Sequence, residues 1–372
     1  MVPALAVAGA LRAENAEVTF IGGERAESEL VPAAGFQLRK ISVEGMSRTN
    51  ALHALRALGR ACGAFLHSRA LLKELAPDAV LGGGGYVAGP VGLAAVTLRI
   101  PLVLSEADSH LGLTNRLLAR FARRVCLSFP LAGRESPRYR VTGRPIPPVQ
   151  EDQAGARERL GIAAGETCLL VFGGSLGARS INEAAVEAFA GEASTDATPI
   201  DTTSAPRTSI DTTPIRDPFT GKVLTRTAFG VLHVAGRRDY PELAARNLPS
   251  GYDLREYLDL EAFGDALAAA DLVVARAGGS VFEIAAHATP AILVPYPHAS
   301  ADHQTANARW MADAGAAIVI PDGELNGTRL AREVAVLLAD RPRLAAMARA
   351  AKGLARPDAA REIADELLKA AA

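Results

Sequence analysis

Apolar runs that end in glycine turns alternate with longer helical segments, and this alternation limits the possible folds most strongly. Runs of this kind occupy residues 16–23, 78–85, 100–106, 167–175, 229–236, 271–279 and 290–297. Alanine-rich and leucine-rich segments such as 113–124 and 181–190 separate them. A strand that is apolar throughout is buried on both faces, and helical crossovers join parallel strands. The chain is therefore predicted to be an α/β protein with parallel sheets.

Two such series occur, one before and one after the proline-rich segment 141–153, and 372 residues are enough for two domains of roughly 150 residues each. We expect an N-terminal domain at 1–142, a linker at 143–153 and a C-terminal domain at 154–372. Within the last, residues 194–222 are rich in Thr, Ser, Pro and Asp. Such a composition offers too few apolar groups to offset the ordering entropy, so we predict a disordered insertion there.

Composition excludes several classes of protein. The net charge of −1 gives no indication of a nucleic-acid partner. Cys62, Cys126 and Cys168 show neither metal-binding nor disulfide spacing, which fits a reducing cytosol. No apolar run reaches the roughly 18 residues that span a bilayer, and we see no signal peptide. We therefore expect a cytosolic protein whose membrane contact, if any, is peripheral.

Three glycine-rich turns follow predicted strands, at 82–90, 173–180 and 276–280. Ligands bind at the carboxyl ends of parallel strands, where glycine lets the backbone approach a phosphate and a helix N-terminus offers free N–H groups. Each turn alone fits a tight strand-to-helix connection equally well. Three in one chain favour ligand binding, although none has the Gly-Lys-Ser/Thr ending of a P-loop.

Two of these turns carry polar side chains with alternative roles. In "GGSLGA" (173–178), Ser175 and the backbone of Gly174, Leu176 and Gly177 form a possible phosphate cradle, whereas Ser175 could also be a plain N-cap. Glu283 lies three residues after Ser280, a spacing typical of the capping box. The alternative is that Glu283 accepts hydrogen bonds from a diol such as ribose.

Further polar residues follow two other strands. Segment 295–310 contains His298, Asp302, His303, Gln304 and Asn307, whose spacing suits sugar hydroxyls better than a metal, with a solvated loop as the alternative. Segment 105–124 begins with Glu106, Asp108 and His110. A carboxylate there could deprotonate a hydroxyl nucleophile, or simply cap the following helix.

Segment 51–75 is amphipathic and basic. Leu58, Phe65 and Leu66 lie among Arg56, Arg60 and Arg69. The segment could rest on an anionic membrane surface, or it could be an ordinary packed helix with a basic outer face.

Taken together and in order, these stretches resemble the MurG family of UDP-N-acetylglucosamine transferases, which make lipid II for peptidoglycan. The resemblance is carried by "PALAVA", "GGGGYVAGP", "LTNRLLARFA", "VTGRPIP", "FGGSLGARSINEA", "RAGGSVFEIA" and "PYPHASADHQTANA". It implies a GT-B architecture of two Rossmann-like domains, with lipid I as the acceptor in the first and UDP-N-acetylglucosamine in the second. It also implies a peripheral enzyme on the cytoplasmic face of the cell membrane, with the helix around Phe65 on the leaflet.

The resemblance also implies residue roles. The donor-binding set is Gly174, Ser175, Gly177, Leu258, Gly279, Ser280, Glu283, Gln304, Arg144 and Asp108. The residues lining the acceptor diphosphate pocket are Gly82, Gly83, Gly84, Gly85 and Tyr86. Glu106 and Asp108 are the candidate catalytic carboxylates. No Asp-x-Asp motif is present, so we expect no metal and no cofactor.

One departure affects the expected chemistry. The family has a first glycine loop, G-G-T-x-G-H, just before "PALAVA", and this sequence begins inside its tail, so we expect the first strand, that loop and its histidine to be missing here. Two other functions therefore stay open: a GT-B transferase acting on another glycolipid or natural product, and an inactive nucleotide-sugar-binding protein.

Overall fold

The computed structural model describes residues 1–24, 27–41, 51–190 and 229–372, and of residues 51–61 only the backbone. The predicted insertion at 194–222 lies outside the described residues, as does the side chain of Leu58. The chain divides into two compact units, one of residues 1–147 with 356–372 and one of residues 148–355. This division differs from the expected boundaries, because the last helix belongs to the first unit.

The first unit contains two parallel pieces of sheet. One pairs β1 (Thr19–Gly22) with β2 (Gln37–Lys40), and the other has the order β3-β4-β5-β6. The strands of the second piece are β3 (Val80–Gly82), β4 (Leu102–Glu106), β5 (Arg124–Leu127) and β6 (Tyr139–Val141). The helices are α1 (Val2–Ala13), α2 (Glu27–Ala33), α3 (Ala51–Leu75), α4 (Gly85–Leu98), α5 (Leu113–Leu118) and α14 (Ala359–Ala371).

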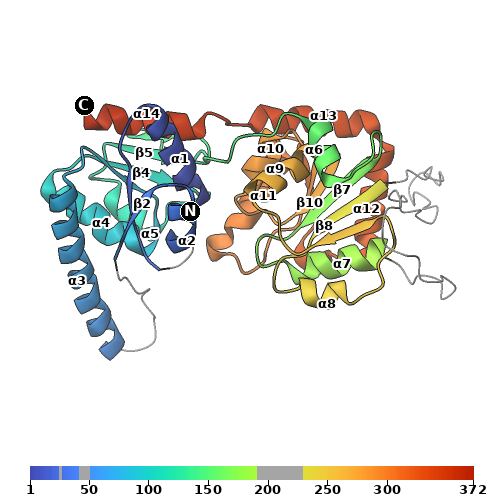
Figure 1. The fold of residues 1–372 in the computed structure, drawn as a ribbon, viewed down its shortest axis with the longest axis horizontal. Helices are drawn as coiled ribbons and strands as arrows, with labels where there is room; N and C mark the ends of the chain where they lie inside the picture. The colour runs from blue at the N-terminus through green and yellow to red at the C-terminus, as the bar shows by residue number, and fades with distance from the viewer. Residues whose placement is uncertain (25–26, 42–50, 191–228) are drawn as a thin grey trace. The chain divides into compact units, whose positions relative to one another are not determined.

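Helices cover both faces of the four-stranded sheet, because its strands direct apolar side chains to both faces. Leu102 and Leu104 of β4 pack in a core with α3, α4 and α5. Val103, between them, packs in a second core against α1 and α14. Figure 1 shows α14 beside α1 on that face. Glu366 of α14 is 5% exposed and forms ion pairs with Arg124 and Arg140, which fixes the last helix to β5 and β6.

The second unit is built on one six-stranded parallel sheet with the order β12-β11-β10-β7-β8-β9. Its strands are β7 (Thr167–Phe172), β8 (Phe229–Val234), β9 (Tyr252–Arg255), β10 (Leu272–Ala275), β11 (Ala291–Leu293) and β12 (Ala317–Val319). Its helices are α6 (Gln153–Leu160), α7 (Arg179–Phe189), α8 (Tyr240–Ala244), α9 (Leu260–Ala269), α10 (Val281–Ala286), α11 (His303–Asp313), α12 (Gly327–Ala339) and α13 (Arg341–Leu354), with short 3₁₀ turns at Ser300–Asp302 and Asp322–Glu324.

The strand order of this sheet reverses at β7. The chain proceeds outward from β7 to β8 and β9, then returns to place β10 on the other side of β7. Phe172, the last residue of β7, pairs with Val234 of β8 and with Ala275 of β10, so all three strands end at one level. Such a reversal is where doubly wound sheets bind ligands. The prediction of an α/β fold with parallel sheets is confirmed.

Candidate functional site

The glycine loops predicted to bind a ligand meet at this switch point. Residues 173–178 follow β7 and residues 276–280 follow β10, and the two strands are neighbours. The carboxyl ends of the strands therefore bring together segments that lie about a hundred residues apart in sequence. This is the arrangement expected of an anion site between a strand end and a helix N-terminus.

The loop 173–178 is shaped by close backbone contacts. A Cβ at Gly173 would lie 2.3 Å from the Cβ of Ala178, and one at Gly177, whose φ is +86°, would lie 2.2 Å from the carbonyl oxygen of Ala235. Ser175 is exposed at the top of the loop. The N-cap of α7 is Ala178, so the interpretation of Ser175 as an N-cap is wrong and its hydroxyl is not used to start the helix.

The loop after β10 is fastened to the loop after β11. Arg276 donates to the carbonyl oxygens of Val294 (3.1 Å) and Pro295 (3.2 Å) and forms an ion pair with Asp322. Such a multiply bonded guanidinium holds the two loops in one geometry. No role for Arg276 could be predicted from the sequence, because its partners follow other strands and are distant in sequence.

Two amides complete this connection. Asn307, 2% exposed on α11, donates to the carbonyl oxygen of Ala277 at 3.0 Å. Gln304 accepts from the backbone N–H of Tyr296 at 3.0 Å through its side-chain oxygen, and its side chain is partly exposed. The structure thus places Gln304 beside the loops that carry Gly279 and Ser280.

Glu283 lies in the first turn of α10 and is partly exposed. Ser280 is the N-cap of this helix, but its side chain makes no capping hydrogen bond. The serine half of the predicted capping box is therefore not formed. The backbone oxygen of Glu283 accepts from the N–H of His287, as in an ordinary helix. Glu283 stands at the positive end of α10, where a carboxylate is favoured.

Leu258 follows β9 at the same edge of the sheet and is partly buried. Its segment is tied to the loop after β8, since Gly236 N–H donates to the carbonyl oxygen of Glu256 at 3.0 Å. The predicted residues that the structure brings to one edge of the second unit are Gly174, Ser175, Gly177, Leu258, Gly279, Ser280, Glu283 and Gln304.

Glu106 ends β4 in the first unit and is 6% exposed. One carboxylate oxygen accepts from Gly112 N–H (2.9 Å) and from the amide of Asn115 (3.0 Å), and the other accepts from Asp108 N–H (3.3 Å). Both oxygens are therefore committed to holding the loop 107–112. This use was not predicted, and it makes Glu106 an anchor of the loop.

Asp108 and Arg144 lie in the first unit, near Glu106. Arg144 donates to the carbonyl oxygen of Ala107 at 3.3 Å, so the arginine borders the same loop. The Asp108 side chain is partly exposed. Within the described part of the chain, no hydrogen bond reaches its carboxylate.

The acceptor loop expected at 82–86 leads into α4. Gly84 (φ +80°) and Gly85 (φ +77°) adopt backbone conformations that only glycine takes without strain. A Cβ at Gly82 would lie 2.7 Å from Leu104, so a larger residue would disturb the sheet. Gly83 and Tyr86 are exposed, Tyr86 by 61%. The loop therefore presents backbone N–H groups at the start of a helix of 14 residues.

Asn115 was missed by the sequence analysis. It is 1% exposed, and its amide donates to the carbonyl oxygen of Ser105 (3.1 Å) as well as to Glu106. A Cβ on Gly84 would lie 3.4 Å from the Asn115 amide nitrogen. Asn115 thus links the loop 82–86 to the loop of Asp108. An asparagine on the apolar stripe of a helical segment was the available signal.

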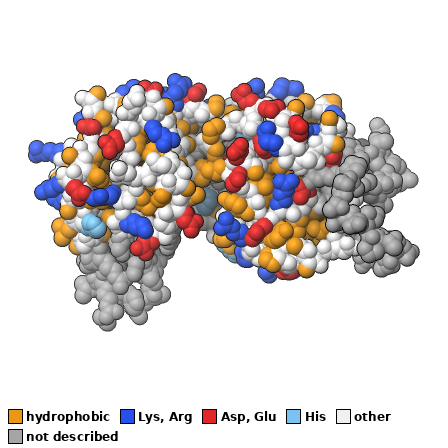
Figure 2. Space-filling model, viewed as in Figure 1, with side chains coloured by type: hydrophobic (Ala, Val, Ile, Leu, Met, Phe, Trp, Pro, Cys, Tyr) orange, Lys and Arg blue, Asp and Glu red, His pale blue; other side chains and the backbone are white. Residues whose placement is uncertain are grey.

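Five large apolar side chains on or beside three helices of the first unit are exposed. They are Leu66 (63%), Leu93 (44%), Leu113 (56%), Leu117 (55%) and Phe121 (47%), on or beside α3, α4 and α5. We call these the apolar patch. Figure 2 shows hydrophobic side chains interspersed with Lys and Arg on the visible face of this unit. Phe65 is partly buried and packs against the core, and the expectation that its helix lies on a membrane stays a prediction.

Among the described helices, none is both long and apolar enough to cross a bilayer. Across the described residues, no group of His, Cys, Asp and Glu side chains is arranged to hold a metal ion. The expectation that the reaction needs no metal stays a prediction.

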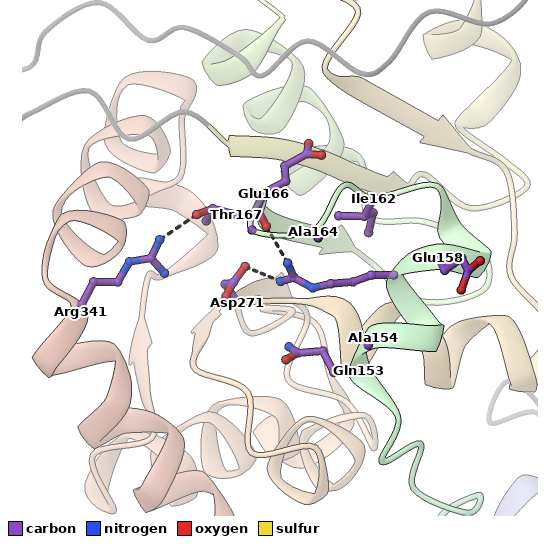
Figure 3. Close-up of a pocket in the computed structure, with 11 residues that line it drawn as sticks. Gln153, Ala154, Glu158, Ile162, Ala164, Glu166, Thr167, Asp271 and Arg341 are labelled. Atoms are coloured by element: carbon purple, nitrogen blue, oxygen red, sulfur yellow. Dashed lines mark hydrogen bonds and ion pairs between the residues drawn. The ribbon is translucent and has the colours of Figure 1, made fainter.

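A pocket of about 670 Å³ lies at the opposite edge of the second unit's sheet (Figure 3). Arg157 crosses it to reach the carbonyl oxygens of Glu166 (2.8 Å) and Ala269 (2.9 Å) and the carboxylate of Asp271 (2.9 Å). Arg341 donates to Thr167 at the start of β7. The pocket contains none of the predicted site residues, and its bonds serve to fasten α6 and α13 to the sheet.

Comparisons with known proteins agree with this geometry. Residues 1–127 match the glycosyltransferase family 28 N-terminal domain, and residues 168–363 match the glycosyltransferase family 28 C-terminal domain. A Moorella thermoacetica protein is 38% identical over 382 residues, which cover 99% of this chain and 95% of that protein. A Rubrobacter xylanophilus protein is 38% identical over 371 residues, which cover 98% of each chain. Both are named UDP-N-acetylglucosamine--N-acetylmuramyl-(pentapeptide) pyrophosphoryl-undecaprenol N-acetylglucosamine transferase.

Solved structures give the same result. The crystal structure of Acinetobacter baumannii MurG superposes with a TM-score of 0.70 at 27% identity, covering 99% of this chain and 95% of that one. The calicheamicin glycosyltransferase CalG4 superposes with a TM-score of 0.64 at 16% identity, which bears on the fold alone.

Proposed function

The chain belongs to glycosyltransferase family 28, with the MurG transferases as its relatives, and from this premise we propose the reaction that it catalyses. It transfers N-acetylglucosamine from UDP-N-acetylglucosamine to lipid I, the muramoyl-pentapeptide linked through a diphosphate to undecaprenol, and so makes lipid II. The 4-hydroxyl of the muramoyl sugar attacks the anomeric carbon of the donor with inversion, and UDP leaves.

The observation that carries the proposal is the meeting of the loops 173–178 and 276–280 at the switch point of the second unit's sheet. The exposed Ser175 hydroxyl and the backbone N–H groups beside it stabilise the diphosphate, whose charge grows as UDP departs. The Gly177 N–H donates to the carbonyl oxygen of Gly174 at 2.9 Å and so closes the loop that holds them. Glu283 accepts hydrogen bonds from the ribose hydroxyls. The alternative role for Glu283, as half of a capping box, is weakened because Ser280 does not form its half.

Leu258, Gln304 and Arg144 complete the proposed donor set. Leu258 offers backbone groups to the uracil from the segment after β9. Gln304, on α11 and bonded to the backbone N–H of Tyr296, contacts the donor sugar. Arg144 contributes positive charge for the leaving diphosphate from the first unit.

The acceptor is proposed to bind in the first unit. The backbone N–H groups of Gly83, Gly84 and Gly85 and the ring of Tyr86 contact the acceptor diphosphate. Of the two candidate carboxylates, Asp108 is the better proton acceptor, because the oxygens of Glu106 are already occupied by three donors. Proton acceptance by a side chain at this point requires an accessible oxygen.

The acceptor's lipid tail requires a membrane surface, and we propose that the apolar patch rests on the cytoplasmic face of the cell membrane. Leu113, Leu117 and Phe121 would enter the headgroup region, while Arg116 and Arg120 on the same segment meet anionic lipids.

Donor binding tests the proposed site directly. Glu283→Gln is expected to raise the Kd for UDP by about 10- to 100-fold, because each of the two hydrogen bonds from the ribose diol loses about 1 kcal/mol when its acceptor becomes neutral. Glu242→Gln on α8, whose side chain is 66% exposed, is the matched control and should leave the Kd unchanged. If both variants bind UDP like the unchanged protein, the assignment of the donor site is wrong.

A further inference from the structure

A set of polar side chains is buried inside the apolar core between α7 and the strands β8 and β9. His233 is 0% exposed, Asn182 1%, Tyr252 6% and Asp239 6%. Burying such groups is unfavourable unless each finds a hydrogen-bond partner. Here the partners are one another, so the four residues form one network within a core of aliphatic and aromatic side chains.

The direction of the hydrogen bonds in this network follows from its ends. The Asn182 amide nitrogen lies 2.9 Å from the carbonyl oxygen of Ala235 and 2.9 Å from a carboxylate oxygen of Asp239, and both can only accept. The Asn182 oxygen therefore faces Nε2 of His233 (3.0 Å), which must carry a hydrogen and donate. Nδ1 of His233 is then an acceptor, and the Tyr252 hydroxyl donates to it at 2.7 Å.

The protonation states of the four side chains agree with these hydrogen-bond directions. Burial lowers the pKa of His233 to about 4, so the ring is neutral near pH 7. Burial also raises the pKa of the Tyr252 hydroxyl, which keeps its hydrogen. The Arg238 guanidinium beside Asp239 holds the pKa of that carboxyl below its usual range, so Asp239 stays an acceptor. One arrangement of hydrogens satisfies every member.

The network ends on the loop 235–239, which presses against the loop of Ser175. The Ala235 oxygen that accepts from Asn182 is the atom that a Cβ on Gly177 would meet at 2.2 Å. A Cβ on Gly236 would lie 2.1 Å from the backbone nitrogen of Gly177. Arg237 N–H donates to the carbonyl oxygen of Ser175 at 3.4 Å. A shift of the Ala235 carbonyl therefore has to move Gly177 and Ser175 with it.

We propose that the hydrogen-bonded chain Tyr252–His233–Asn182 is a positioning device that sets the place of Ser175 and its loop for the donor diphosphate. This inference rests on the proposed donor site and adds residues that do not touch the substrate. An apolar core would fill the same volume, but it would not fix the direction of the Ala235 carbonyl. Binding groups must be held within about 0.5 Å of their productive geometry by a supporting layer of this kind.

The test compares variants that break the hydrogen-bonded chain with a variant that keeps its donor and acceptor. His233→Leu leaves the Tyr252 hydroxyl and the Asn182 oxygen without partners, whereas His233→Gln has both a donor and an acceptor. Tyr252→Phe removes one oxygen and keeps the test open if His233→Leu does not fold. The control is Leu338→Ala, which removes an equally buried side chain (1% exposed) near the end of α12. Leu338 lies near the far edge of the sheet, because Arg341, three residues later, bonds to Thr167 there.

We would measure the Kd for UDP by calorimetry, and the KM values for UDP-N-acetylglucosamine and for a lipid I analogue. His233→Leu should raise the Kd for UDP and the donor KM by about tenfold or more, the loss expected when a buried hydrogen-bonding group is left unsatisfied. The acceptor KM should stay within about twofold, and His233→Gln should recover most of the donor affinity. Tyr252→Phe should lie between His233→Leu and the unchanged protein.

Two results would overturn the inference. One is a Kd for UDP that equals that of the unchanged protein both in Tyr252→Phe and in His233→Leu, if the latter folds. The other is an equal loss of UDP affinity in Leu338→Ala at the same thermal stability, which would show a general effect of destabilisation. Failure of the unchanged protein to transfer sugar to the lipid, with the UDP affinities ordered as expected, would sink the proposed reaction and support the positioning role.

Discussion

Glu106 offers a prediction that separates a structural role from a catalytic one. The substitution is Glu106→Gln, which keeps the size of the side chain and one acceptor oxygen. In the structure Glu106 accepts from Gly112 N–H at 2.9 Å, from the Asn115 amide at 3.0 Å and from Asp108 N–H at 3.3 Å. Glutamine can turn its oxygen toward Gly112 and Asn115, but its NH₂ group then faces the N–H of Asp108.

The magnitude follows from these bonds. A hydrogen bond to a charged group contributes about 1.5–3 kcal/mol and a neutral one about 0.5–1.5 kcal/mol, so two retained bonds lose about 1 kcal/mol each. The third, longer bond is lost, at about 1 kcal/mol. We expect the first unit to lose about 2–3 kcal/mol, which for a unit of this size lowers its Tm by roughly 4–12 °C.

The single tryptophan makes the assay specific to each unit. Trp310 lies on α11 in the second unit, so its fluorescence follows the unfolding of that unit, while far-UV circular dichroism follows both. Glu106→Gln should shift a transition seen by dichroism and leave the fluorescence transition unchanged. The reasoning is refuted if both transitions are unchanged while kcat falls more than about 100-fold, the loss typical of a missing general base.

Three further predictions address the second unit and the membrane. Gly177→Ala should raise the Kd for UDP by about tenfold or more, because backbone strain at φ +86° (about 1–2 kcal/mol) adds to the clash with Ala235. The control is Gly161→Ala, which has the same kind of strain at φ +71° but open space around it, and it should bind UDP normally. Burial lowers the pKa of His233 to about 4, so the second unit should lose about 3 kcal/mol of its free energy of unfolding as the pH falls from 6.5 toward 4. Urea unfolding followed by Trp310 fluorescence measures this loss, and His233→Gln should abolish the pH-dependent part. Phe121→Glu should reduce sedimentation with phosphatidylglycerol vesicles by about fivefold or more while the Kd for UDP stays unchanged; equal sedimentation would exclude the apolar patch as the membrane surface.

The fold was predictable where a strand lies within a longer apolar run of the sequence. Each of the seven apolar runs contains a strand of the structure. The strands missed were β2, β5, β6, β9 and β12, which have three or four residues each. Length alone does not separate them, because β1, β3, β10 and β11 are as short but lie within longer apolar runs. β2 (Gln37–Lys40), by contrast, reads as polar. The pairing of the missed strands depends on neighbours that are distant in sequence.

The placement of α14 was not predictable for a related reason. Its apolar stripe shows that Ile363 and Leu367 must be buried, but not against which sheet. The choice is made by Arg124 and Arg140 of the first unit, which meet Glu366 across more than two hundred residues of sequence. A pattern within one helix cannot reveal partners of this kind.

The candidate site was likewise predictable only in part. Glycine loops after strands identified the segments that carry Ser175 and Glu283, because the switch point of a parallel sheet puts such loops together. The network of Asn182, His233 and Tyr252 was missed, since each residue alone looks like an isolated polar side chain in an apolar element. Their meeting is a consequence of tertiary packing, in which α7 covers the face shared by β8 and β9.

The central claim is the reaction itself. The most direct test mixes the purified chain with UDP-N-acetylglucosamine, labelled in the sugar, and a lipid I analogue, and identifies the products by mass spectrometry. We expect one labelled N-acetylglucosamine on the muramoyl sugar for each UDP released. UDP binding without transfer would indicate an inactive nucleotide-sugar-binding protein, and transfer only to a different glycolipid or natural product would place the chain among other GT-B enzymes; either result contradicts the account.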